Sequence, residues 1–428
     1  MVILAMTQIA HSETAYEIQW GCKIGDNSSI QESRSVSLDS QGNAFVTGRT
    51  NGSLDGLNLG DYDAFLARYD ATGSAVWIRQ FGTGDRDCGQ AVLADPFGNA
   101  YVQTISYAQG TGWTDNCLRK YDATGQLLWS QHLGTGGSYD KGGLAGDLAG
   151  NVYMIGYTNE GIGDSGWTSF LSKYNGDGNL VWARPVHNWH GYWVRGVAAD
   201  SVGNTYVTGW QEALNGYASH LDKYDPNGNL LWTHEILAGA SEQSEGVMVD
   251  AAGHVIVTGF ADHSDISPDD PWDGFLNAYE PNGQTLWSRT VGASDPDHFL
   301  PEALAMDTDG NILVAGGSAW LGGGWEDFWG AFVSKYNPDG DEIGTQHVGC
   351  YYDDRALGIA ADNAGNVVLT GSISFWDGPN VWPYPGHTDA GLVSLAIPEP
   401  VTLSLLALGG LAILRCRSGQ VLRRRKSA

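Results

Sequence analysis

Eight tryptophans with acidic or amide neighbours are the residues of this 428-residue sequence best suited to ligand chemistry. They stand in Gly-rich stretches such as Thr111-Gly-Trp113-Thr114-Asp115. An indole face covers the apolar side of a pyranose, while carboxylates and amides bond its hydroxyls. The pattern predicts a carbohydrate-binding surface. Its candidate residues are Trp113, Trp167, Trp193, Trp272, Trp320, Trp325, Trp376 and Trp382.

Three other interpretations of these stretches stay open. Large tryptophans in Gly-rich loops can pack the loops onto one another. Acidic loops can hold calcium, although Asp307-Thr-Asp309-Gly-Asn311 lacks the later bidentate Glu of a calcium loop. Paired acids can also serve a polysaccharide-acting hydrolase or lyase. The sequence has no nucleophile elbow, HExxH, P-loop or dinucleotide fingerprint, so no catalytic residue is predicted and no cofactor is expected beyond calcium.

One segment recurs seven times and organises the chain. Its clearest copy, Ala199-Asp-Ser-Val-Gly-Asn-Thr-Tyr-Val-Thr-Gly209, predicts a strand, a tight turn and a second strand. A repeat of 50 to 57 residues is typical of a propeller or a solenoid. The turn glycines of the seven copies are Gly42, Gly98, Gly150, Gly203, Gly253, Gly310 and Gly365.

Each copy continues into a second pair of strands. In the fourth copy these are His220-Leu-Asp-Lys-Tyr224 and a strand with Trp232, so one unit is a meander of four strands, A to D. Such a sheet buries both faces only between like neighbours around an axis. The seventh unit lacks strand D, and residues 16–20 supply one. The sequence therefore predicts an all-β fold: a seven-bladed β-propeller over residues 15–396, whose last blade is closed by the N-terminal strand.

The meander also predicts where function lies. The A–B and C–D turns share one face of a propeller, and here they are short and uniform. The B–C and D–A loops share the other face, are long and variable, and carry the eight tryptophans. Because loops on a rigid scaffold are the usual place for binding, the loop-rich face is the predicted binding surface.

Charge and cysteine usage exclude some functions. The formal net charge is −27, with 22 Lys and Arg against 49 Asp and Glu, which argues against a nucleic-acid partner. Five scattered cysteines form no CxxC motif. Free thiols are the favoured interpretation, and a disulfide such as Cys22–Cys350 stays open.

The repeats resemble a known family. Units of the type Asp-x-x-Gly-Asn-x-Tyr-Val-Thr-Gly, followed by Phe-Leu-x-Lys-Tyr-Asp-x-x-Gly-x-Leu-x-Trp, are similar to the bacterial SBBP (seven-bladed β-propeller) repeats over roughly residues 15–396. The resemblance implies a propeller and an extracytoplasmic setting. It implies no common activity and so no catalytic residues. The chain departs from the pattern at Gln103-Thr104, at His254 and at Gly344, where a Trp is expected.

The two ends of the chain suggest export. Residues 397–428 contain Pro398-Glu399-Pro400, then the apolar run 401–414, then a basic end. This order predicts a short hydrophobic helix with a cytoplasmic basic flank, and it resembles the PEP-CTERM sorting signal. The resemblance implies processing by an exosortase-type enzyme in a bacterium that makes extracellular polysaccharide. Residues 1–14 are either a remnant of an export signal or disordered.

Together these features predict a non-enzymatic, exported propeller of the cell envelope or extracellular matrix, anchored at its C-terminus transiently or stably. Its expected partners are the exosortase-type enzyme, the membrane through the C-terminal helix, and an extracellular polysaccharide. The alternative is a hydrolase or lyase acting on that polysaccharide.

Overall fold

The structure is a computed structural model, and it describes most of the repeat region. The described residues are 17–25, 29–108, 113–135, 142–158, 168–187, 192–213, 216–236, 241–262, 272–292, 298–320, 328–348, 354–362, 364–373 and 390–396. The predicted sorting segment 397–428, with Pro398, Glu399 and Pro400, lies outside them, as do residues 1–14. None of the described residues belongs to a helix long and apolar enough to cross a membrane.

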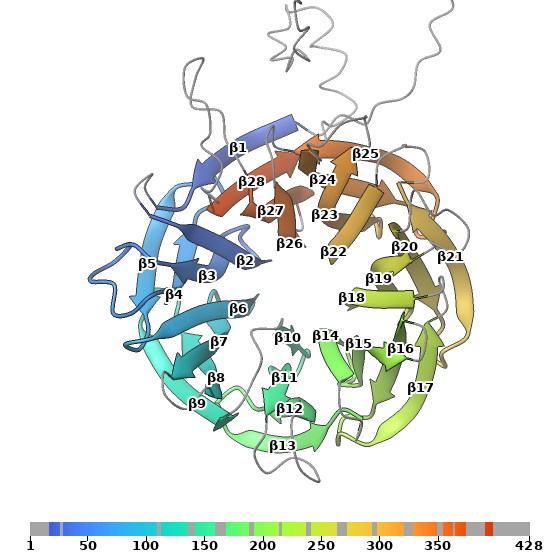
Figure 1. The fold of residues 1–428 in the computed structure, drawn as a ribbon, viewed down its shortest axis with the longest axis horizontal. Coiled ribbons are helices and arrows are strands. Elements are labelled where there is room, and N and C mark those ends of the chain that lie inside the picture. Colours follow the sequence, from blue (N-terminus) through green and yellow to red (C-terminus); the bar gives the residue numbers. More distant parts are fainter. Residues whose placement is uncertain are drawn as a thin grey trace, which may run out of the picture.

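Seven four-stranded antiparallel sheets stand around a central axis (Figure 1). The innermost strands, A, are β2 (Gln31–Leu38), β6 (Arg86–Ala94), β10 (Gly143–Gly146), β14 (Tyr192–Ala199), β18 (Ser241–Val249), β22 (His298–Met306) and β26 (Arg355–Ala361). The next strands, B, are β3 (Ala44–Thr50), β7 (Ala100–Ala108), β11 (Val152–Thr158), β15 (Thr205–Ala213), β19 (Val255–Asp262), β23 (Ile312–Trp320) and β27 (Asn366–Ser372).

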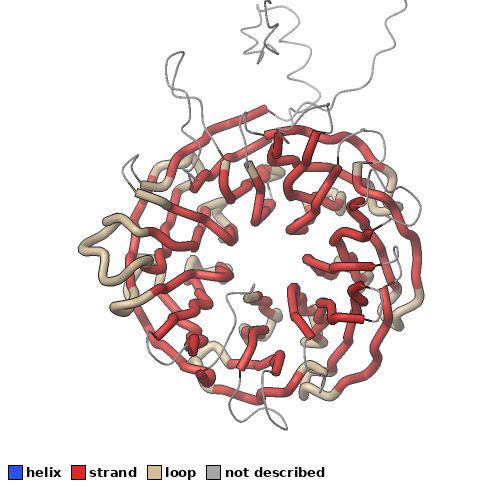
Figure 2. The backbone as a smooth tube through the Cα atoms, in the orientation of Figure 1, coloured by secondary structure: helices blue, strands red, loops and turns tan. Residues whose placement is uncertain are grey.

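The outer half of each blade completes the ring. Strands C are β4 (Asp63–Tyr69), β8 (Trp113–Tyr121), β12 (Thr168–Tyr174), β16 (Gly216–Tyr224), β20 (Trp272–Tyr279), β24 (Phe328–Tyr336) and β28 (Ala390–Ala396). The outermost strands, D, are β5 (Ala75–Phe81), β9 (Leu127–Thr135), β13 (Leu180–Pro185), β17 (Leu230–Ile236), β21 (Thr285–Val291), β25 (Glu342–Val348) and β1 (Glu17–Lys23). Figure 2 shows these strands, joined by loops, arranged in a ring around one axis.

The predicted closure is confirmed. The N-terminal strand β1 pairs with β28 and becomes the outer strand of blade 7, with Glu17 opposite Ala396 and Trp20 opposite Ser394. Beyond the strand, the Ile24 amide donates to the Ala390 carbonyl over 3.0 Å, and the Ile24 side chain is fully buried. Strands from both ends of the propeller thus share one sheet, so β28 is paired on both sides and blade 7 has four strands like the other six blades.

The core lies between blades rather than within them. Seven hydrophobic clusters each combine residues of two neighbouring blades. In one of them Tyr206 and Leu221 of blade 4 pack against Val257 and Phe275 of blade 5. Since each sheet buries its two faces against its neighbours, a single blade has no core of its own.

Each outer-strand Trp joins its blade to the next one. The Trp182 indole Nε1 donates to the Pro226 carbonyl over 3.1 Å, and Trp232 Nε1 donates to Pro281 over 3.3 Å. In each of the five bonded copies the acceptor lies in the C–D turn of the following blade, whereas Trp129 packs on the turn glycine Gly178 without such a bond. The ring rests on the turn glycine: a Cβ added to Gly228 would lie 3.0 Å from the Trp182 ring. The recurring Trp and turn Gly are therefore one packing device.

The exception at Gly344 has a physical reason. Its blade 6 strand, β25, faces blade 7, whose strands C and D are β28 and β1. These two strands are not consecutive in the chain, so no C–D turn joins them. A Trp at position 344 would have neither a turn carbonyl nor a turn Gly to rest on.

The recurring Asp of the A–B turn caps its own turn. In blade 6, Asp307 Oδ1 accepts the amides of Asp309 and Asn311 at 3.0 and 2.8 Å. The other oxygen, Oδ2, lies 2.7 Å from Lys335 Nζ, and both side chains are buried. Lys335 therefore occupies the oxygen that a calcium ion would need, and no group of three or more metal-binding side chains occurs among the described residues.

This pair gives an acid-sensitive contribution to stability. Burial alone raises the pKa of the Asp307 carboxyl, but hydrogen bonds from Lys335 and Asn311 outweigh it and lower the pKa below its ordinary value. A lowered folded-state pKa stabilises the fold above the unfolded-state pKa of about 3.9, and the contribution disappears as the pH falls through the folded-state pKa. Asp307→Asn should therefore destabilise the protein at pH 7 by about 1.5–3 kcal/mol. In urea titrations the gap to the unmodified protein should shrink below about pH 4; an equal gap at pH 3 and pH 7 would contradict it.

Candidate functional site: the axial channel

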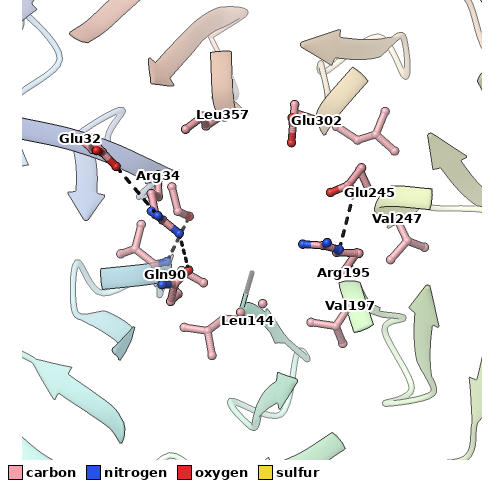
Figure 3. Close-up of a pocket in the computed structure, with 18 residues that line it drawn as sticks. Glu32, Arg34, Gln90, Leu144, Arg195, Val197, Glu245, Val247, Glu302 and Leu357 are labelled. Carbon is pink, nitrogen blue, oxygen red and sulfur yellow. Dashed lines mark hydrogen bonds and ion pairs between the residues drawn. The ribbon is translucent and has the colours of Figure 1, made fainter. Parts of the chain in front are cut away.

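A β-bulge interrupts the innermost strand of six blades at one position. There the pairing with strand B skips a residue, five positions before the Asp that opens the A–B turn. The extra residue of a bulge takes no part in the ladder, and bulges commonly re-aim a side chain. The bulge residues are Arg34, Gln90, Arg195, Glu245, Glu302 and Leu357, and Gly142 holds the same position in blade 3. All seven line one cavity on the propeller axis (Figure 3), and we call them the channel ring.

The bulge explains the Gly that ends each Val-Thr-Gly motif. A Cβ added to Gly209 would lie 2.1 Å from the Trp193 carbonyl oxygen of the bulged strand. In blade 2 the motif has Thr104 instead, and the glycine stands on the other strand as Gly89, opposite Thr104. At Gln103-Thr104 the chain departs from the repeat because the glycine of this residue pair stands on strand A in blade 2, whereas in the other bulged blades it stands on strand B.

The cavity has a volume of about 380 Å³. Its wall has a polar level, formed by the channel ring, and an apolar level next to it. Two positions beyond the channel ring, towards the A–B turns, each inner strand carries a branched aliphatic residue. Those that line the cavity are Val92, Leu144, Val197, Val247 and Leu304. Such a volume and such a mixture of apolar and polar lining are typical of small-molecule sites.

Charge is divided across the channel ring. On one side Arg34 Nη1 donates to Gln90 Oε1 over 3.1 Å, which links blades 1 and 2. On the other side Arg195 Nε lies 3.7 Å from Glu245 Oε1, and Glu302 stands in the next blade (Figure 3). Glu245 is only 7% exposed, so this carboxylate is held in a largely water-free wall.

A second carboxylate near Arg34 is already engaged. Glu32 forms a two-bonded pair with Arg49, at 2.9 Å to Nε and 2.7 Å to Nη2. Burial alone lowers the pKa of Arg49, but the bond to Glu32 and its charge raise it overall. Arg34 Nη2 lies 3.9 Å from Glu32, a long contact by comparison.

Trp193 is the only predicted ligand residue whose side chain is described. It pairs across strands with Trp210, and the two rings lie 4.5 Å apart. Trp210 also contacts Tyr217 at 4.7 Å and carries the Arg195 guanidinium over its ring at 5.0 Å. Aromatic packing thus connects Trp193 to the channel ring, while part of the Trp193 side chain stays exposed.

The other predicted tryptophans are placed less fully. Trp113 and Trp272 begin strands C of their blades and Trp320 ends a strand B, so these three residues stand at the strand ends next to the B–C loops and not within the loops, where the sequence had placed them. Their side chains lie outside the described part, as do Trp167, Trp325, Trp376 and Trp382 entirely. Sugar binding by this set stays a prediction.

A separate polar cluster lies between blades 3 and 4. His187 Nε2 lies 2.7 Å from Asp222 Oδ2, and the His187 ring is 5.7 Å from His220. His187 has a backbone φ of 53°, unusual for a residue other than Gly or Asn. Burial lowers the pKa of His220, so the cluster favours neutral His220 at pH 7.

Cys22, Cys88 and Cys117 are free thiols, and burial raises the pKa of Cys22 to about 11.

The channel ring was not predicted from the sequence, although a signal for it exists. Counting five residues back from each turn Asp gives charged or amide side chains in five of seven copies. At a buried inner-strand position such residues are unexpected, because burying charge is unfavourable unless it is compensated. The glycine on strand B that faces five of the six bulges is the second signal.

Comparison with known proteins supports the repeat but assigns no activity. Residues 19–55 match the family model described as the SBBP beta-propeller repeat, which confirms the predicted resemblance for that part of the chain. No curated protein matches the sequence.

Solved structures of similar shape share little sequence with this chain. Puromycin hydrolase is 15% identical with a TM-score of 0.49, over 80% of this chain and 50% of that one, so the chain spans half of its length. The β-propeller domain of the trilobed protease from Pyrococcus furiosus is 8% identical with a TM-score of 0.49, over 85% of this chain and 93% of that domain. Sqt1 from Chaetomium thermophilum is 10% identical with a TM-score of 0.44, over 90% of this chain and all of Sqt1.

Proposed function

We propose that this chain is a non-enzymatic binding propeller that holds a glycan or another surface partner on its loop-rich face. The observation that carries the proposal is the joined arrangement of Trp193, Trp210 and Arg195 beside the axial cavity. It combines aromatic faces with a charged hydrogen-bonding group, the combination that suits a sugar. The seven-sheet ring holds it on rigid strands.

The proposed setting is the cell surface or extracellular matrix. It rests on the tail with Pro398, Glu399 and Pro400, on its apolar run and on its basic end, which together suit processing by an exosortase-type enzyme. The strongly acidic composition suits a polysaccharide partner better than a nucleic acid.

A polysaccharide hydrolase or lyase is the second candidate, because two carboxylates, Glu245 and Glu302, line the same cavity. Binding ranks first because Glu245 already has Arg195 as a charged neighbour and is almost fully buried. A carboxylate so engaged is poorly placed to exchange a proton with a substrate.

Glycan-array binding with the full chain tests the proposal. Trp193→Ala should weaken retention of the bound glycan about tenfold, the usual scale for an aromatic anchor. A double replacement of Trp325 and Trp382 by Ala should also weaken it, without much change in melting temperature. The matched control is Trp287→Ala, which removes an outer-strand Trp bonded to Pro338 and should lower stability but not affinity.

Two results would contradict the proposal. If Trp193→Ala lowers stability and leaves retention unchanged, the aromatic group serves only to pack the loops. If reducing ends are released during incubation and release stops in Glu302→Gln, the chain is the polysaccharide-cleaving enzyme of the second candidate.

A further inference from the structure

The blade 1 side of the channel ring carries an excess of positive charge. Two arginines, Arg34 and Arg49, share a single carboxylate, Glu32, and Arg49 takes it with two short bonds. Within the described part of the chain, Arg34 has only the amide oxygen of Gln90 and the distant Glu32 as polar contacts. A guanidinium has five N–H donors, so most of the Arg34 donors remain available to the cavity.

Gln90 provides a second, independent observation that points to a ligand at this site. Its side chain is 5% exposed, and its Nε2 has no hydrogen-bond partner among the described residues. A buried amide donor without a partner is unfavourable by about 1–3 kcal/mol, so such groups call for an explanation. Because its Oε1 accepts from Arg34, the same side chain fixes the guanidinium and leaves a second donor beside it.

The opposite side of the cavity favours hydroxyl groups. Glu245 and Glu302 line it, and a carboxylate has about four lone-pair positions for donors. Below them lies the aliphatic level that includes Val197 and Val247. A ligand that fits all three regions has one anionic group, several hydroxyls and an apolar face.

We infer that the channel binds a uronate, with the sugar carboxylate on Arg34 and its ring hydroxyls towards Glu245 and Glu302. The inference rests on the proposed glycan function and names the sugar class. A neutral hexose would leave Arg34 desolvated without an anion, and an amino sugar would bring a second cation to it. A phosphate or sulfate ion would offer nothing to the acidic side or to the aliphatic level.

Calorimetric titration of the full chain with matched sugars tests the inference. The probes are glucuronate, galacturonate and mannuronate, each compared with its neutral hexose. The uronates should bind at least about tenfold more tightly, as a charge-assisted bond to carboxylate predicts. A short oligouronate in a parallel titration distinguishes a free sugar acid from a chain end as the source of the carboxylate.

Two variants cancel the net positive charge at Arg34 in different ways. Arg34→Gln should reduce uronate affinity about 10- to 100-fold and change hexose affinity about twofold or less. Gln90→Glu leaves Arg34 in place but supplies it with an internal carboxylate, and it should reduce uronate affinity similarly. Arg34→Lys should restore part of the preference, because it keeps the charge but loses the planar fork. Unfolding midpoints of all three variants show whether the fold is retained.

The outcomes separate this inference from the function on which it rests. Equal affinity of the unmodified chain for uronates and hexoses, or a uronate affinity unchanged in a folded Arg34→Gln, overturns the uronate assignment. Glycan-array binding that depends on Trp193 would then leave the proposed binding function standing. If no array glycan binds but uronates bind through Arg34, the channel assignment holds and the loop-face proposal fails.

Discussion

A chain that lacks residues 17–24 should lose about 5 kcal/mol or more of unfolding free energy. The deletion removes the whole of β1 and with it the six register pairs to β28. It also removes the fully buried Ile24 side chain and the Trp20 indole, whose Nε1 donates to the Ala71 carbonyl of blade 1 over 3.0 Å. Buried apolar side chains contribute about 1.5–3 kcal/mol each and ladder hydrogen bonds about 0.5–1.5 kcal/mol each. Urea denaturation followed by tryptophan fluorescence measures the loss.

The deletion also predicts a change of association state. Without β1 the strand β28 becomes an exposed edge, and exposed edges pair with other chains. Light scattering should therefore show a larger average particle mass for the shortened chain than for the unmodified chain. A synthetic peptide of residues 17–25 added in trans should reverse this association and restore part of the stability. An unchanged urea midpoint for the shortened chain would show that blade 7 does not depend on β1.

Trp182→Ala is expected to lower the free energy of unfolding by about 3–5 kcal/mol. The Trp182 side chain is 8% exposed and packs on the blade 4 turn at Gly228. Its ring lies 6.1 Å from that of Tyr153. Lys173 Nζ donates to the same Pro226 carbonyl over 3.4 Å. Removing the indole therefore leaves a cavity between blades 3 and 4 and takes one of two donors from this carbonyl. Chemical denaturation measures the change, and a loss below about 1 kcal/mol would contradict the packing role.

Gly344 offers the matched control for this prediction. It holds the Trp position in blade 6, where the facing blade has no C–D turn. Gly344→Trp should therefore give no stabilisation, because the new indole has no turn to rest on. A gain comparable to the loss in Trp182→Ala would show that the turn contact is not what makes the other tryptophans stabilising.

Much of the fold was predictable because the same local structural signals recur in each of the seven repeats. The turn Asp and Gly, the strand alternation and the outer Trp each have a local cause, so they leave a mark in every copy. Even the closure could be predicted, since Trp20 stands near the N-terminus in the environment of an outer strand. Gly344 could be recognised as an exception, but its reason required knowing which blade it faces.

The candidate site was less predictable because its residues differ from blade to blade. Arg34 and Glu245 occupy equivalent positions but share no chemistry, so repeat comparison hides them. Their meeting on the axis depends on ring closure, which brings positions more than two hundred residues apart into one cavity. The aromatic loops drew attention for the opposite reason, since composition alone distinguishes them.

Because of the bulge, the residues that line the channel are not the residues that hold the strands together. A bulge residue makes no ladder contact, so exchanging one such side chain for another leaves the strand pairing unchanged. Six of the seven ring positions have this freedom, and Gly142 does not, since a Cβ there would meet the Gln103 side chain. The side chains that line the channel can therefore be substituted one blade at a time without changing the fold. Propellers built from the same repeat can differ in the ligand they bind while they keep the same arrangement of strands.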